Sequence, residues 1–400
     1  MDITRLFKSL DEMRSLIKLK IHITDKATIL DKETTRPSLK KCYELLKHSA
    51  RSLYLVISAV KAPLRDAICV YYLILRAMDT IEDDMTIPAN VKYSILRTFV
   101  TIVKDPNWRY TQSQDKDAVV LEQFPCISKE FSLLSVSYQQ TILASVPEIG
   151  EGLSTSQDMP YRNVEEFKKY TRYATGIPAT QVFEMFRACQ PVSDAERKVI
   201  EDYGILIQVT NDLRDFYQDL QAGRKRLWPE SVWKKYASDV REFTSPDGED
   251  RGRACLNELI TLGLEVIPSC MDFLARCPSQ ECLTFFAIPQ VMGIATLSSL
   301  YNNPKVFHGA VKIRKGEAAH IMLNSTSIDK VKAMNARYIS EILARVPNED
   351  PNSATTRQAC KVALSFTQTP KPQNSLTSIH FLGPLLVIVA ITFLLILMYF

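Results

Sequence analysis

Apolar residues recur at spacings of three and four along most of the chain, and no strand-turn-strand alternation repeats. Prolines at Pro37, Pro63 and Pro88 suit the first turns of helices, so the pattern predicts a series of helices. The predicted helices cover residues 37–60, 64–83, a segment from 88 onward, 127–146, 164–189, 194–221, 255–274, 283–301 and 328–345. Polar stretches predict loops at 105–107, 111–117, 244–250 and 348–352.

The last twenty residues, 381–400, read FLGPLLVIVAITFLLILMYF and carry no charge. A helix of this length spans about 30 Å, the thickness of a bilayer core. A buried terminal helix would usually carry a polar face, and a cleaved lipid-anchor signal would need an export signal at the N-terminus. We therefore expect a tail anchor at 381–400, a polar tether at 367–380 and one helical domain at 1–366. Lys361 and Lys371 precede the span, which places that domain on the cytosolic side.

Composition supports an all-α fold, because only 12 of the 400 residues are glycine and no glycine-rich dinucleotide loop occurs. The net charge of +4 is too small to indicate nucleic-acid binding. The 9 cysteines are scattered without a C-x-x-C pair, which predicts reduced thiols.

The helix predicted at 64–83 ends in three acids, Asp79, Glu82 and Asp83, which share one helix face. The turns before them are almost wholly apolar. Clustered acids at the end of a buried helix repel one another and need a cation, and ligands that are all oxygen suit Mg²⁺. Taken alone, this first acidic motif could equally be a solvated helix end.

The helix predicted at 194–221 carries a similar set, with Asn211, Asp215 and Asp219 on one face after apolar turns. If this second acidic motif faces the first, the two could hold several Mg²⁺ ions around a diphosphate and promote its departure. The pairing of two such sets favours a functional interpretation. Basic residues lie near both motifs and fit either surface ion pairs or diphosphate contacts: Arg76, Arg214, Arg224, Lys225 and Arg226.

The chain resembles the squalene synthases (farnesyl-diphosphate farnesyltransferases) over nearly its whole length. The resemblance rests on ARSL at 50–53, YLILRAMDTIEDDMT at 72–86, Arg214 and Asp215 with Asp219, LWP at 227–229, CLNELI at 255–260, FAIPQ at 286–290 and VKIRKG at 311–316.

The resemblance implies a single-domain, all-α isoprenoid-synthase fold with a central cavity. In that cavity two farnesyl diphosphates would couple to presqualene diphosphate, which would then be reduced by NADPH to squalene. It further implies Mg²⁺ as a cofactor, a monomer, no nucleic-acid partner, and a tail anchor in the endoplasmic reticulum membrane.

The resemblance also assigns roles to individual residues. The Mg²⁺ ligands would be Asp79, Glu82, Asp83, Asp215 and Asp219, and Tyr170 would transfer a proton in the first step. The nicotinamide cofactor or diphosphate would contact Arg51, Ser52, Arg76, Arg214, Lys312 and Arg314. The substrate pocket would include Tyr72, Gln208, Asn211, Arg224, Phe285, Phe286, Pro289 and Gln290.

Several positions depart from the family pattern. Arg172 replaces a histidine, Pro178 enters a predicted helix, Val209 replaces a lysine, and Asp212 is an additional acid. Leu53 and Phe286 also differ. The resemblance implies that Leu53, Val209, Asp212 and Phe286 lie near the places where presqualene diphosphate and the nicotinamide would sit. A competent squalene synthase, a paralogue that stops at presqualene diphosphate, and an inhibitor-resistant copy of the enzyme all stay open.

Other classes fit less well. A phytoene-synthase-type enzyme would need neither NADPH nor, usually, an anchor. A chain-elongating prenyltransferase would show D-D-x-x-D, which neither motif does. A tail-anchored scaffold without activity would give no reason for paired acidic faces.

Overall fold

The structure, a computed structural model, describes residues 10–21, 34–155, 159–224 and 226–368, without the side chains of Arg51 and Ser52. The chain divides into two units, Met1–Gln368 and Thr369–Phe400. The second unit, which holds the predicted anchor and most of the predicted tether, lies outside the described residues. Within the described ranges every regular element is a helix, as an all-α fold predicts.

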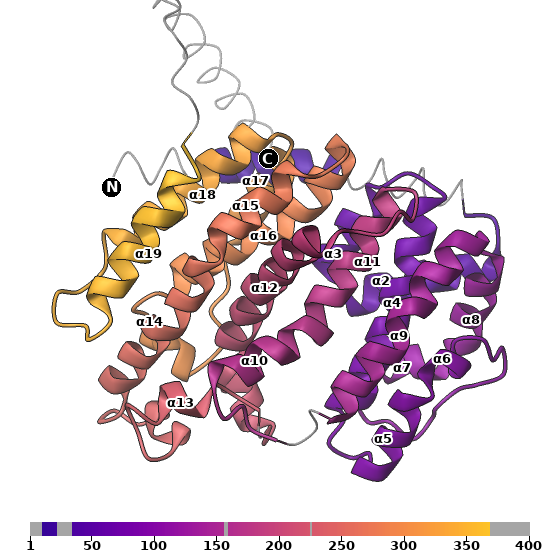
Figure 1. The fold of residues 1–400 in the computed structure, drawn as a ribbon, viewed down its shortest axis with the longest axis horizontal. Coiled ribbons are helices and arrows are strands. Elements are labelled where there is room, and N and C mark those ends of the chain that lie inside the picture. Colours follow the sequence, from indigo (N-terminus) through magenta and orange to yellow (C-terminus); the bar gives the residue numbers. More distant parts are fainter. Residues whose placement is uncertain (1–9, 22–33, 156–158, 225, 369–400) are drawn as a thin grey trace, which may run out of the picture. The chain divides into compact units, whose positions relative to one another are not determined.

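Figure 1 shows how these helices are arranged. Besides a helix over residues 10–21, they are α2 (Pro37–Ser49), α3 (Arg51–Ser58), α4 (Leu64–Asp83), α5 (Ala89–Arg97), α6 (Phe99–Ile102), α7 (Ala118–Glu122), α8 (Phe124–Leu133), α9 (Val136–Thr155), α10 (Val164–Thr171), α11 (Ile177–Phe186), α12 (Asp194–Gln221), α13 (Glu230–Trp233), α14 (Glu249–Glu265), α15 (Ile267–Ala275), α16 (Gln280–Leu300), α17 (Lys315–Asn324), α18 (Ile328–Leu343) and α19 (Ser353–Ser365). A π-helical turn covers Arg172–Gly176, and 3₁₀ turns cover Val240–Thr244 and Pro304–Phe307.

The two helices that carry the acidic motifs, α4 and α12, begin and end at the predicted residues. Other predicted helices are divided or extended. The segment predicted at 37–60 breaks at Ala50, where φ is −143° and ψ is 64°. The segment predicted at 255–274 divides at Val266, because Pro268 starts a new first turn. Helices α17 and α19 were not predicted.

Helix α12 lies at the centre of the described residues, packed against α14, α15, α16 and the π-helical turn. Its start is fixed by Ser193, whose side chain accepts from the backbone N–H of Glu196 in a capping box. The crossing with the π-helical turn needs a glycine at position 204. A Cβ there would lie 2.8 Å from the backbone nitrogen of Gly176, so this contact holds α12 close to the segment that carries Tyr170.

The segment predicted as one helix at 164–189 changes its winding midway. It runs from α10 through the π-helical turn into α11, where Pro178 occupies the first turn. The expected loss of a hydrogen bond at Pro178 is thus accommodated by the change of winding. Arg172, in the π-helical turn, forms ion pairs with Glu148 at 2.6 Å and Glu201 at 2.8 Å. This departure from the family pattern therefore links α9 to α12.

Helix α16 is apolar on all sides. Among the described residues it is the one helix long and apolar enough to cross a membrane, but 78% of its most apolar window is buried inside the protein. We interpret α16 as the central core helix, which brings Phe285 and Phe286 to the interior.

Candidate active site

The structure brings the two acidic motifs together through Arg224, which follows α12. Its Nη1 lies 3.0 Å from Oδ1 of Asp83, and its Nε lies 3.3 Å from Oδ1 of Asp219. Burial raises the pKa of Asp219 to about 6, against the lowering effect of Arg224. The acids of α4 and α12 therefore face one another across a guanidinium.

Glu82 is the most deeply buried acid of the first motif, with a side chain that is 1% exposed. Arg226 forms an ion pair with its Oε1, and the hydroxyl of Tyr170 donates to its Oε2 at 3.4 Å. The guanidinium of Arg226 also lies 4.3 Å from the centre of the Tyr170 ring. Burial raises the pKa of Glu82 to about 7, although Arg226 opposes this, and burial also raises the pKa of Tyr170.

Asp79 lies one helical turn earlier on α4 and is more exposed, at 42% of its side chain. Arg76 donates to it at 2.7 Å and also donates to the hydroxyl of Tyr72 at 2.8 Å. Burial raises the pKa of Asp79 to about 6, against the effect of Arg76.

Asp212, the additional acid of α12, points into the same region. Gln208 donates to its Oδ1 at 2.7 Å, and Thr175 donates to Oε1 of Gln208 at 3.1 Å. No basic side chain among the described residues forms an ion pair with Asp212. Burial raises its pKa to about 7. It therefore differs from the five acids of the two motifs, each of which has an arginine partner.

A small polar pocket of about 60 Å³ lies between the two acidic motifs. Its walls are Glu82, Asp83, Met85, Tyr161, Tyr170, Gln208, Asp212, Asp219, Arg224 and Arg226. Nearly all of them are ionisable or polar, and they come from both acidic helices. Such a pocket suits a small, highly charged group such as a diphosphate.

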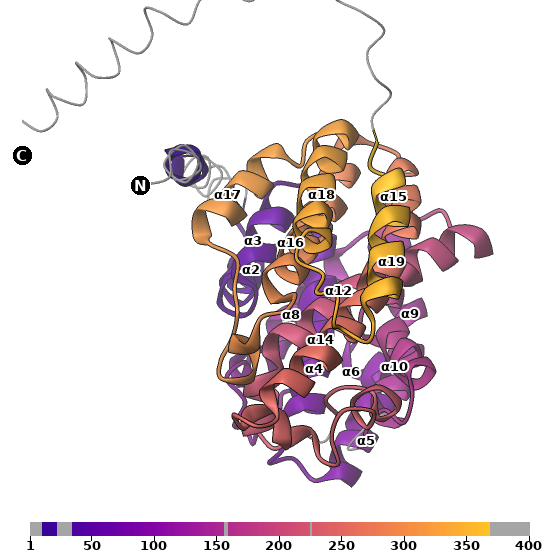
Figure 2. The same cartoon turned by 90° about the vertical axis from the view of Figure 1, so that its left-hand side faces the viewer.

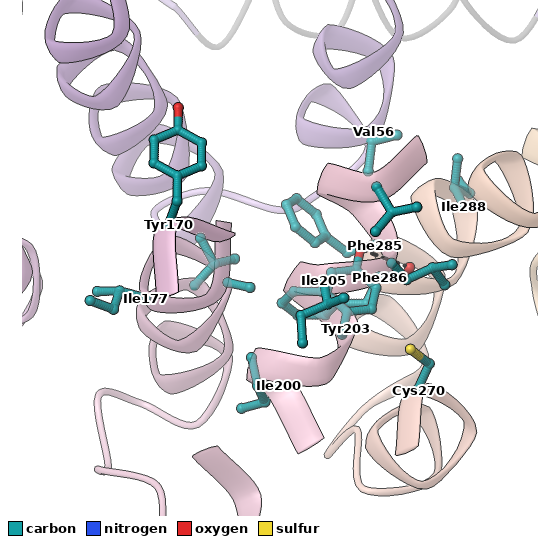
Figure 3. Packing of buried hydrophobic residues seen from close by; sticks show 14 of the residues in the cluster. Val56, Tyr170, Ile177, Ile200, Tyr203, Ile205, Cys270, Phe285, Phe286 and Ile288 are labelled. Carbon is teal, nitrogen blue, oxygen red and sulfur yellow. Dashed lines mark hydrogen bonds between the residues drawn. The ribbon is translucent and has the colours of Figure 1, made fainter. Parts of the chain in front are cut away.

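A larger apolar pocket of about 290 Å³ begins at Asp79 and Arg76 and extends between α3, α4, α11, α12 and α16. Its lining includes four residues of the predicted substrate pocket: Tyr72, Phe285, Phe286 and Pro289. Phe286 belongs to an aromatic cluster and lies close to Tyr203 (Figure 3). Its ring centre is 5.7 Å from that of Tyr203 and 4.9 Å from that of Phe273. Phe285, 5.1 Å from Phe286 between ring centres, is 8% exposed, whereas Phe286 is 2% exposed.

Some predicted pocket residues lie elsewhere. Gln290 is fully buried and donates to Sδ of Met271 at 3.3 Å, so it faces α15 rather than the pocket. Asn211 lines neither cavity. Arg214 and Asp215 pair with each other at 2.5 Å beside the polar pocket but do not line it.

The predicted cofactor residues are not gathered at one place. Lys312 is exposed, and Arg314 pairs with Glu12 at 2.6 Å and with Glu317 at 3.3 Å. Arg76 lies at the apolar pocket. The side chains of Arg51 and Ser52 lie outside the described residues.

Val209 requires a correction. The family resemblance implies that position 209, a lysine in the family pattern, lies near the diphosphate. In the structure Val209 is 3% exposed and faces Gly263 of α14. It points toward α14 in the core, although it lies only one helical turn from Asp212. Only Asp212 of these two departures reaches the polar pocket.

Four residues of the polar pocket are absent from the predicted site: Met85, Tyr161, Asp212 and Arg226. Asp212 is one of the departures from the family pattern, and Met85 closely follows the first acidic motif in the sequence. Arg226 belongs to the basic run at 224–226, which follows the second acidic motif in the sequence. This proximity to acidic residues is a signal from which its place in the site could be predicted. Tyr161 lies 5.6 Å from Tyr170 between ring centres and is 6% exposed. No pattern in the sequence around Tyr161 indicates its place in the site.

Comparison with known proteins agrees with this geometry. The family model described as squalene/phytoene synthase matches residues 46–317. A squalene synthase of Mus musculus is 41% identical over 332 residues, which cover 82% of this chain and 80% of the relative. The chain belongs to the squalene/phytoene synthase family. A Candida albicans member named squalene synthase ERG9 is 34% identical, with 88% of this chain and 84% of the relative covered.

A solved structure extends the family relationship to the fold. A complex described as TcSQS with the ligand E5700 matches with a TM-score of 0.78 and 28% identity, covering 83% of this chain and 98% of that chain. The same protein with the ligand BPH1237 gives a TM-score of 0.79. The helical arrangement around the polar and apolar pockets is therefore that of a squalene/phytoene synthase.

Proposed function

We propose that this protein is a squalene synthase, which joins two farnesyl diphosphates to presqualene diphosphate and reduces that intermediate to squalene. The observation that carries the proposal is a polar pocket built from both acidic helices, next to an apolar pocket, in a chain closely related to squalene synthases. A farnesyl diphosphate has the same two parts, a charged head and an apolar chain.

Arg224 and Arg226 are the cations that the chain itself offers to a diphosphate in the polar pocket. In the first step the C–O bond of one substrate breaks and the diphosphate departs with the electron pair. The guanidinium groups stabilise that departing charge in a largely buried site. The apolar pocket keeps water from the allylic cation, and its aromatic rings favour positive charge.

The acidic residues fit Mg²⁺ by their chemistry. They are all oxygen donors, and burial raises the pKa of several of them, as expected where acids await a cation. In this structure the acids pair with arginines. Among the described residues, no three acidic, histidine or cysteine side chains are arranged around one metal position. We propose Asp79, Glu82, Asp83, Asp215 and Asp219 as the ligands. Bound Mg²⁺ would neutralise the departing diphosphate.

Tyr170 is the proposed residue for proton transfer. Its raised pKa keeps its hydroxyl protonated at neutral pH, and the proton points to Oε2 of Glu82. Coupling of the two farnesyl groups requires loss of one proton from carbon. The Tyr170 oxygen would accept that proton as its own hydroxyl proton passes to Oε2 of Glu82, whose pKa of about 7 allows it to hold a proton.

For the second step we propose NADPH, which would supply hydride. Cationic side chains suit its phosphates, and Lys312 forms no ion pair with another described residue. We assign Arg51, Ser52, Arg76, Arg214, Lys312 and Arg314 to this role by family resemblance.

We further propose that residues 381–400 anchor the protein in the endoplasmic reticulum membrane, with a monomeric catalytic body in the cytosol. The support for the anchor is the uncharged run of twenty residues at 381–400.

The test is to incubate the full chain with labelled farnesyl diphosphate and Mg²⁺, with and without NADPH. We expect squalene with NADPH and presqualene diphosphate without it. Presqualene diphosphate under both conditions would identify a paralogue that stops early, and release of diphosphate without coupling would overturn the proposal.

A further inference from the structure

A second apolar cavity, which we call the lateral cavity, adjoins the apolar pocket. It has a volume of about 520 Å³ and lies between residues 10–21, α3, α16 and α17. Its apolar walls include Leu19, Val56, Val60, Phe285, Ile288 and Leu323. None of the acids or arginines of the polar pocket reaches it.

The wall between the lateral cavity and the apolar pocket is thin. Phe285 lines both cavities. On α3 the neighbouring residues face opposite sides, since Ile57 lines the apolar pocket and Val56 lines the lateral cavity. Figure 3 shows Val56, Phe285 and Ile288 near one another at this boundary. A change in the rotamer of one phenylalanine ring would therefore join the two apolar spaces.

The helix over residues 10–21 covers the lateral cavity. This helix lies beside α17 (Figure 2). Its inner side carries Leu19, which lines the cavity, and Glu12, which pairs with Arg314. Its outer side is apolar: Met13, Ile17 and Ile21 are 51%, 57% and 59% exposed.

Leu10 extends this outer apolar face, and the basic residues Arg14, Lys18 and Lys20 flank it on the helical wheel. A helix with an apolar face bordered by lysine and arginine lies well at the boundary between lipid head groups and acyl chains. A single exposed apolar residue would need no explanation, but a continuous face on one short helix does.

We propose that the lateral cavity is the route by which the hydrocarbon product leaves the apolar pocket for the bilayer, with the helix over residues 10–21 lying on the membrane surface. This inference rests on the proposed function. Squalene carries no polar group, so the charged mouth formed by Glu82, Asp83 and Arg224 offers it no favourable exit. The diphosphate leaves at the polar pocket, and the hydrocarbon leaves at the opposite side of Phe285.

The first test fills the lateral cavity without touching the apolar pocket. Thr284→Trp and Leu323→Trp add bulk to its walls, and Ser132→Trp, at a separate surface hollow, is the control. The full chain is reconstituted in phospholipid vesicles, and squalene formation is measured in one turnover with excess enzyme and then at steady state. We expect an unchanged first turnover and a steady-state rate at least about tenfold lower, with a burst of product.

An unchanged steady-state rate in both filled variants overturns the exit route. Equal loss in the first turnover and at steady state also overturns it, because the cavity would then hold substrate. If the unaltered chain makes no squalene, the proposed function fails instead, so the two failures are distinguishable.

A second test does not depend on the folding of cavity variants. Benzoylphenylalanine replaces Ile17, or Val136 as a matched control, because Val136 is 67% exposed on α9. Illumination in vesicles that contain anionic phospholipid should link position 17, but not position 136, to lipid. Links from position 17 to a second copy of the chain, or no link at all, would contradict the proposal.

Discussion

The hydroxyl of Tyr170 donates to Oε2 of Glu82 at 3.4 Å, although the two residues lie 88 positions apart in the sequence. Arg226 completes this contact by pairing with Glu82 and covering the Tyr170 ring. The proposed proton carrier, a carboxylate of the first acidic motif and a cation for diphosphate thus form one unit. The proposed first step therefore needs side chains from three segments: α4, α10 and the segment that follows α12.

Replacing Tyr170 by phenylalanine should separate the role of its hydroxyl from that of its ring. Tyr170→Phe keeps the contacts with Tyr161 and Arg226, so we expect little change in melting temperature. Formation of presqualene diphosphate should fall by about 10² to 10⁴, the usual contribution of a positioned acid or base. Product analysis with labelled substrate measures this. A rate close to that of the unaltered chain would remove Tyr170 from the mechanism.

The raised pKa values predict an unusual dependence of stability on pH in the absence of metal. Burial raises the pKa of Glu82 and of Asp212 to about 7, so the folded chain holds protons that the unfolded chain releases above about pH 4. Stability from these groups is present below about pH 4 and is lost as the pH rises toward 7. Added Mg²⁺ should therefore raise the melting temperature more at pH 8 than at pH 5.

Thermal melts from pH 5 to pH 8, with a chelator or with Mg²⁺, test this expectation. Asp212→Asn is the matched control and should flatten part of the slope, since it removes one of the two groups. Asp84 does not interfere, because hydrogen bonds hold its pKa near 2, below this range. Equal stabilisation by Mg²⁺ at both ends of the range would argue against a buried acidic site.

Asp212 should weaken anion binding because it has no arginine partner. We expect Asp212→Asn to tighten the binding of farnesyl diphosphate and of diphosphate-like inhibitors by about tenfold, or ~1.4 kcal/mol, at pH 7.5. At pH 6 the gain should shrink, since Asp212 is then largely protonated. Titration of substrate at both pH values measures the effect, and identical affinities would make Asp212 a neutral difference.

Val209→Lys should not restore a family-like site. Val209 is buried in the core, so a lysine there would lack a partner and destabilise the fold by about 3 kcal/mol or more. A lower melting temperature without tighter substrate binding is the expected result. Tighter binding in a stable Val209→Lys variant would show that this side chain reaches the diphosphate.

Truncation can remove the predicted anchor, but the cut should follow Gln368 and not precede Thr367, the first residue of the predicted tether. Thr367 is buried, and its hydroxyl donates to the carbonyl of Leu364, so it completes the end of α19. We expect truncation after Gln368 to give a soluble, active protein, and truncation before Phe366 to be less stable. Sedimentation and activity assays distinguish these cases. A truncated chain that fails to fold would place residues 381–400 in the core.

Local signals predicted much of the fold and part of the site. The bounds of α4 and α12 follow from proline, capping and apolar spacing, which act within a few residues. The place of Tyr161 and the inward direction of Val209 depend on how helices pack, so the sequence around each residue could not reveal them. Arg224 is intermediate, because its charge was visible but its bridge between Asp83 and Asp219 required the fold.

The central claim is that the two acidic motifs act as one diphosphate site. The most direct measurement is diphosphate release from farnesyl diphosphate by Asp83→Asn, by Asp219→Asn and by the double variant. We predict that each single variant loses at least about a hundredfold in rate while remaining folded, and that the double variant is scarcely slower than either. Near-normal release by either single variant, or losses that simply multiply in the double variant, would contradict the account.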